Sequence, residues 1–139
     1  MTIHIKRSEL EKIQSHALSE FPYECCGVLI GTSTPSPRVT EARKVPNTNR
    51  TLKTRRYNID PLSYRKIEEE TEESGIEILG VYHSHPNHPA TPSEFDLTNA
   101  FPNFSYIIQS IDNGKVGAIT SWRLDPSRGN FYQESVKIT

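Results

Sequence analysis

Residues 76–96 read IEILGVYHSHPNHPATPSEFD, and the rest of the chain can be interpreted around this stretch. Apolar side chains occupy both alternating faces of residues 76–82, which predicts a strand in the middle of a sheet. His83 and His85 follow at its end. Because side chains alternate along a strand with period two, both imidazoles project from the same face and form a rigid pair of nitrogen ligands.

The segment after the histidines can bring a carboxylate back to them. Its prolines cannot continue a strand, and a new helix is predicted to begin at Pro92-Ser93 with Asp96 in its first turn. Two histidines and one carboxylate, with a fourth position left to water, are the ligand set of a catalytic zinc site. A second interpretation needs no metal, because Ser93 and Asp96 also have the spacing of a helix N-cap and an acidic first-turn residue.

A second acidic residue stands beside another strongly apolar strand. Residues 25–31 are nearly all apolar and predict a central strand, and Glu24 lies at its beginning. Glu24 is either a surface carboxylate at a helix-to-strand turn or a general base that faces the metal site. The residues alone leave both interpretations open.

Taken together, these residues resemble the JAMM (MPN-plus) zinc metalloprotease signature. The histidines of residues 83–85, seven intervening residues and Ser93-x-x-Asp96 match it in identity and spacing. Glu24, within the sequence PYECCGVLIG at residues 22–31, matches its upstream glutamate. The resemblance runs from about residue 10 to residue 124.

The resemblance implies a role for each signature residue. His83, His85 and Asp96 would hold one catalytic zinc ion with a bound water. Glu24 would act as general base and then as general acid. Ser93 would hydrogen-bond the tetrahedral species formed during hydrolysis. His88 is not required by the signature and is expected to be a surface histidine in the proline-flanked loop.

The resemblance also implies a fold and a substrate class. The expected fold is a single α/β domain of MPN type over residues 1–139, with a mixed central β-sheet flanked by helices. The implied reaction is hydrolysis of a peptide or isopeptide bond after the C-terminal glycine of a ubiquitin-like protein. The compact chain is most similar to small bacterial members that act on sulfur carrier proteins with a Gly-Gly tail, from which they release an amino acid or a short peptide. Residues 57–61 and 122–124 also look like those members.

Two other function classes fit the sequence less well than a peptidase. Many MPN domains are assembly scaffolds without metal, but such domains usually lack one or more of the five signature residues, and all five are present here. Zinc-dependent base deamination uses His-x-Glu and Pro-Cys-x-x-Cys elements, which this sequence does not contain.

Composition excludes several kinds of partner. The chain has 139 residues, the size of one domain, and 16 basic against 17 acidic side chains give a net charge of -1. A general attraction to nucleic acid or to an anionic membrane is therefore not expected. Residues 1–7 lack the apolar core of a secretory signal, and no run approaches the roughly 20 apolar residues of a membrane span, so a cytoplasmic protein is expected.

The remaining expectations concern secondary structure. A helix should begin at Ser8 with a capping box to Glu11 and bury Leu10, Ile13, Ala17 and Leu18. Further helices are expected over residues 61–74 and 93–100. Strands are expected over residues 2–6, 38–45, 104–111, 116–124 and 131–138, the last at an edge of the sheet. The basic residues 47–56 are expected to form a solvated loop or, as the resemblance implies, a flap along a substrate groove. The neighbours Cys25 and Cys26 should point to opposite faces of a strand as buried, unreactive thiols.

Overall fold

The strand that carries the two histidines lies in the middle of the sheet. In this computed structural model, which describes all 139 residues, β4 (Glu77–Pro86) pairs antiparallel with β2 (Cys26–Thr32) and parallel with β5 (Ser105–Asp112). Gly80 permits the close approach to β5, since a Cβ atom there would lie 1.9 Å from the carbonyl oxygen of Ser105. The predicted central position of this strand is confirmed.

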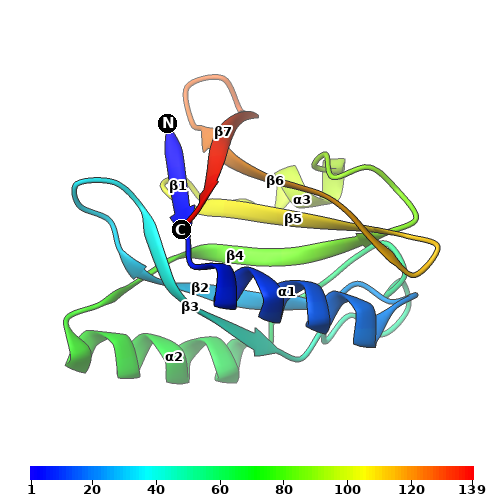
Figure 1. Ribbon diagram of the computed structural model, residues 1–139, viewed down its shortest axis with the longest axis horizontal. Coiled ribbons are helices and arrows are strands. Elements are labelled where there is room, and N and C mark those ends of the chain that lie inside the picture. The colour runs from blue at the N-terminus through cyan, green and yellow to red at the C-terminus, as the bar shows by residue number, and fades with distance from the viewer.

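The sheet closes on itself, which the sequence did not indicate. Its strand order is β1-β3-β2-β4-β5-β6-β7, and β7 pairs in parallel with β1 to complete a barrel. The remaining strands are β1 (Thr2–Ile5), β3 (Arg38–Val45), β6 (Lys115–Asp125) and β7 (Asn130–Ile138). In Figure 1 the first and last strands, β1 and β7, lie side by side. The prediction of an edge strand at residues 131–138 is therefore wrong, because β1 covers that edge.

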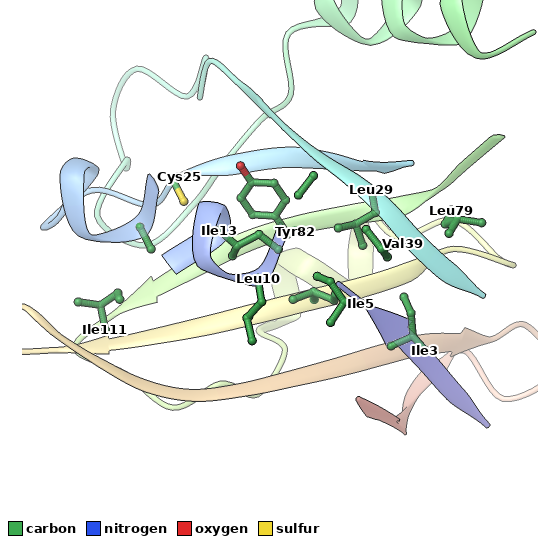
Figure 2. Packing of buried hydrophobic residues seen from close by; sticks show 13 residues of the cluster. Ile3, Ile5, Leu10, Ile13, Cys25, Leu29, Val39, Leu79, Tyr82 and Ile111 are labelled. Atoms are coloured by element: carbon green, nitrogen blue, oxygen red, sulfur yellow. The ribbon is translucent and has the colours of Figure 1, made fainter. Parts of the chain in front are cut away.

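The first helix, α1 (Arg7–Glu20), supplies one side of the larger hydrophobic core. Figure 2 shows Leu10 and Ile13 of this helix among the side chains of the strands, including Tyr82. Two expectations for α1 are wrong. Lys6 is its N-cap and makes no side-chain cap bond, because β1 runs directly into the helix and leaves Ser8 inside the first turn. Leu18 is 42% exposed and lies outside the core.

The second helix, α2 (Pro61–Ser74), packs on a separate, smaller core. Its first residue is proline, and Gly75 ends it in the left-handed conformation with φ of 71°, as predicted. Cys25 belongs to the core beneath α1 and Cys26 to the core beside α2, so the neighbouring thiols do point to opposite faces. Burial raises the pKa of the Cys25 thiol to about 12, and that of Cys26 is raised as well, so both are poor nucleophiles.

The third helix, α3 (Glu94–Thr98), is shorter than predicted. Asn99 is its C-cap, and Pro102 follows three residues later.

None of the three helices combines the length and the apolar character needed to cross a lipid bilayer. The mixed sheet with flanking helices is thus confirmed, and α3 together with the end of β4 positions the residues of the candidate site.

Candidate metal centre

The two histidines of β4 are buried side by side. His83 and His85 are 0% and 1% exposed, and their Nε2 atoms lie 3.0 Å apart. Ser84, between them, faces the other way, where its hydroxyl oxygen accepts a 2.9 Å hydrogen bond from the Cys25 N–H. The Ser84 N–H donates in turn to the Cys25 carbonyl. This pair of bonds ties the histidine strand to the segment that carries Glu24.

Asp96 completes a compact set of three donor atoms. Its Oδ2 atom lies 3.3 Å from the Nε2 atom of each histidine. Ligands 2.0–2.2 Å from a tetrahedral zinc ion are separated by roughly 3.3 Å, so the donor chemistry and spacing both fit such an ion. Burial alone would raise the pKa of Asp96, but the two histidines and a backbone N–H hold it well below its ordinary value.

The helix cap and the carboxylate facing the histidines are one feature. The Asp96 N–H donates a 3.1 Å bond to the Ser93 hydroxyl oxygen, and the Ser93 N–H donates a 2.9 Å bond to Asp96 Oδ2. These reciprocal bonds form a capping box at the start of α3. The helix cap and a metal-ligand role for Asp96 are therefore compatible, because the cap fixes the carboxylate that faces the imidazoles.

Each imidazole is held by a further contact. The Nδ1 atom of His85 lies 2.7 Å from the Pro89 carbonyl oxygen, which can only accept, so Nδ1 carries the proton and Nε2 presents its lone pair. Tyr57 stacks on the ring of His83 with centroids 4.4 Å apart. His88 stacks on the ring of His85 at 4.0 Å. The expectation of a surface histidine at position 88 is only partly confirmed, because the side chain is 34% exposed but its ring folds back onto the site.

Glu24 is buried beside the three donor atoms. It is 2% exposed, and neither carboxylate oxygen has a hydrogen-bond partner. One of its oxygens and one nitrogen from each of His83 and His85 all lie within 4.8 Å of one another. Burial, and then the charge of Asp96, raises the pKa of Glu24 to about 9. The interpretation of Glu24 as a surface carboxylate is therefore wrong.

A polar loop fixes the backbone of Glu24. The Asn47 side-chain amide donates to the carbonyl oxygens of Glu24 and Arg56, and its oxygen accepts from the N–H groups of Asn49 and Asn58. Three of these bonds close residues 47–58 into one unit, and the fourth ties that unit to Glu24. The same loop places Tyr57 over the ring of His83. The sequence predicted residues 47–56 as a solvated loop or a flap along a substrate groove, and neither interpretation assigned a role to Asn47. The contribution of Asn47 was missed because it depends on bonds between residues up to 23 positions apart.

An apolar groove of about 850 Å³ leads away from the site. Tyr57 and Asp96 line it near the histidines, and the Arg56 guanidinium lies 4.6 Å from the centre of the Phe95 ring beside it. Nine of its fifteen lining residues are hydrophobic, which include Ile59, Tyr64, Phe101, Phe104 and Tyr106. The groove can accommodate an extended, partly apolar peptide next to the three donor atoms.

Comparison with known proteins identifies this arrangement. Residues 6–125 match the family described as prokaryotic homologs of the JAB domain. The chain belongs to this family. The resemblance to JAMM metalloproteases seen in the sequence is thereby confirmed, and the fold is that of the JAB domain.

Relatives within the JAB family include named proteases. The chain is 32% identical over 112 residues, 81% of its length and 72% of the relative's, to a Thermus thermophilus protein named "Probable TtuB-protein conjugate cleaving protease". It is 36% identical over 106 residues to the desampylase of Haloferax volcanii, which covers 76% of this chain and 75% of that protein. A solution structure of a Desulfitobacterium hafniense protein is also similar, with a TM-score of 0.85 and 26% identity over 100% of this chain and 93% of that one.

Proposed function

We propose that this chain is a zinc-dependent peptidase that hydrolyses the bond after the C-terminal glycine of a ubiquitin-like sulfur carrier protein. The scissile bond is a peptide or an isopeptide bond, and the leaving group is an amino acid, a short peptide or a conjugated protein. One observation carries the proposal. Three possible metal-ligand atoms spaced 3.0–3.3 Å apart lie beside a buried carboxylate that makes no hydrogen bond within the chain. The relatives named as a conjugate-cleaving protease and a desampylase support the same class of reaction.

The metal would be held by His83, His85 and Asp96. Two nitrogen ligands and one carboxylate in a buried set would favour zinc among the common divalent ions. When bound, zinc acidifies water and polarises the scissile carbonyl, and its charge lowers the pKa of Glu24 toward the range in which the carboxylate accepts a proton.

Glu24 would move the protons of the reaction. Because neither carboxylate oxygen makes a hydrogen bond within the chain, the carboxylate can accept a proton from the attacking water and later deliver it to the leaving amine. Its backbone is held by Asn47 and by the carbonyl oxygen of Lys53, which accepts a bond from the Glu24 N–H. A carboxylate in this place accepts a proton from water and later delivers it to the amine, a role worth roughly 10²–10⁴-fold in rate.

Ser93 would stabilise the negative charge that develops on the substrate oxygen. Its hydroxyl oxygen accepts the capping bond from the Asp96 N–H, which leaves the hydroxyl proton free to donate. The cap fixes the position of this donor before substrate arrives, so little reorganisation is needed during the reaction.

The carrier's tail would enter along the apolar groove. Asp96 lines the groove and is also one of the three proposed metal ligands, so residues before the scissile bond would lie within the groove. Glycines at the end of the tail allow the substrate backbone to approach closely where side chains from loop 47–58 and α3 meet. An extended tail beside loop 47–58 can also be held by backbone hydrogen bonds, as in strand addition.

Mass spectrometry of defined carriers tests the proposal. The first substrate would be a carrier whose Gly-Gly tail is extended by one alanine, and the second would be the same carrier joined through its terminal glycine to a lysine side chain. The third, a matched control, would carry the alanine extension after Ala-Ala in place of Gly-Gly. We expect the zinc-loaded enzyme to return the first two to the Gly-Gly mass and to leave the third uncleaved. A zinc-loaded protein that cleaves none of them would contradict the proposed substrate, and a protein that neither binds zinc nor cleaves would indicate an MPN-type scaffold.

A further inference from the structure

The Glu24 carboxylate faces one imidazole nitrogen that is not among the proposed metal ligands. Among all Lys, Arg and His nitrogens, only His88 Nε2 lies within 4.0 Å of it, at 3.7 Å from Oε2. His88 Nε2 is itself a buried polar atom without a partner. Buried polar groups are costly when they make no hydrogen bond, so two such groups that face each other form a natural pair.

The loop that carries His88 is anchored on both sides of this residue. The His88 carbonyl accepts a 3.0 Å bond from the Ser110 hydroxyl, and the Asn87 N–H donates a 2.7 Å bond to the Ile111 carbonyl. The Pro89 carbonyl accepts from His85 Nδ1, as described above. With its ring also stacked on His85, the imidazole is presented to Glu24 by a fixed backbone.

His88 does not have the geometry of an additional metal ligand. A metal ion lies in the plane of each imidazole that binds it. The His88 ring is stacked 4.0 Å from the His85 ring at an angle of 17°, so its plane is displaced from that of His85. A ring stacked in this way cannot share the ion that His85 would bind, and its Nε2 atom is left to face Glu24.

We propose that His88 is a positioning residue for Glu24. This inference rests on the proposed function. The Nε2–H group of His88 donates a hydrogen bond to Glu24 Oε2 and fixes the carboxylate, while Oε1 stays free for proton transfer. The separation of 3.7 Å is longer than a hydrogen bond, but catalytic hydrogen bonds in substrate-free proteins are often long and tighten when substrate binds.

Two variants separate the hydrogen bond from the stacking contact. His88→Phe keeps a flat ring against His85 but has no N–H group, whereas His88→Gln lacks the ring but can donate. On a carrier with an extended Gly-Gly tail, we expect kcat of His88→Phe to fall about 10- to 100-fold, the range for residues that orient a site residue, with KM and zinc content unchanged. His88→Gln should recover most of the loss.

A second measurement does not depend on activity. In ¹⁵N-histidine NMR spectra, Glu24→Ala should shift the His88 Nε2 resonance and leave that of His16, which pairs with Tyr82, unchanged. Wild-type kcat in His88→Phe, or no shift of the His88 resonance, would overturn the inference. A wild-type enzyme that cleaves no carrier would instead refute the proposed function, and the NMR comparison would still decide whether His88 and Glu24 interact.

Discussion

Glu24 is the single residue on which the proposed chemistry depends most. The change Glu24→Gln keeps the shape of the side chain but removes its ability to take up a proton. We expect the variant to fold and bind zinc as the wild type does, with kcat reduced by roughly 10²–10⁴-fold. Steady-state kinetics with zinc analysis of the same samples checks this. A variant that bound zinc and kept most of its activity would remove Glu24 from the mechanism.

Ser93 combines a structural and a chemical role, and the two can be separated. Ser93→Ala loses the cap of α3, which typically lowers the free energy of unfolding by about 1 kcal/mol. It also loses the hydroxyl donor, and we expect kcat to fall by about 10²–10³-fold as a result. Ser93→Thr keeps a hydroxyl and serves as the control. Chemical denaturation and kinetics measure the two effects, and a Ser93→Ala enzyme with wild-type kcat would show that Ser93 is only a cap.

Among single residues, the sequence predicted the site residues that lie at fixed spacing and missed the contacts that loops bring to the site. His83, His85, Ser93 and Asp96 lie within fourteen consecutive residues, so strand alternation and helix capping were enough to bring them together. Glu24 was ambiguous until the family resemblance was considered. The stacking of His88 on His85 depends on how a proline-rich loop turns back, which no periodicity describes.

Among the elements, loop 47–58 links the site to the scaffold. Asn47→Ala would remove four hydrogen bonds and release both the Glu24 backbone and the segment before Tyr57. We expect the free energy of unfolding to fall by about 1–3 kcal/mol and kcat to fall with it. The matched control is Asn58→Ala, because the exposed Asn58 side chain bonds only to Asn49. Equal losses in the two variants would contradict the organising role of Asn47.

The contact between α1 and β3 predicts an acid-sensitive contribution to stability. Burial alone would raise the pKa of Glu9, but hydrogen bonds from Lys12 and the Ala42 N–H outweigh it, and the pKa lies below its ordinary value of 4.5. The stabilisation is therefore complete above about pH 4.5 and is lost as the pH falls through the lower pKa of the folded protein.

Glu9→Gln tests this contribution. At pH 7 we expect the variant to be less stable than the wild type by roughly 1–3 kcal/mol, because a charged acceptor is lost. The difference should narrow as the pH is lowered below about 4.5, since wild-type Glu9 then takes up its own proton. Urea denaturation between pH 7 and pH 3 measures it. A constant difference across this range would contradict the assignment.

The elements themselves were predictable where the pattern was long or the turn chemistry specific. Both long helices, the apolar strands β2 and β4, and the hairpin turn at Asn113 and Gly114, which both have positive φ, agree with expectation. The capping box at Ser8 was wrong because the same spacing occurs inside a helix that begins earlier. Barrel closure was missed because β1 has only four residues, too few to reveal its two parallel neighbours.

Considered as a whole, the molecule assembles its site from parts that are distant in sequence. The proposed ligands come from β4 and the start of α3, and Glu24 precedes β2, so the donor set exists only when the barrel is folded. Zinc binding should therefore stabilise the folded state, and a chelator should lower the melting temperature.

The central claim is that hydrolysis depends on one zinc ion held by His83, His85 and Asp96. The most direct test is cleavage of the extended Gly-Gly carrier by protein stripped of metal and then titrated with zinc, with His83→Ala measured alongside. We predict no cleavage by the stripped protein, full recovery at about one zinc per chain, and no recovery in the variant. Full activity in the stripped protein, or equal recovery in His83→Ala, would contradict the proposed metal centre.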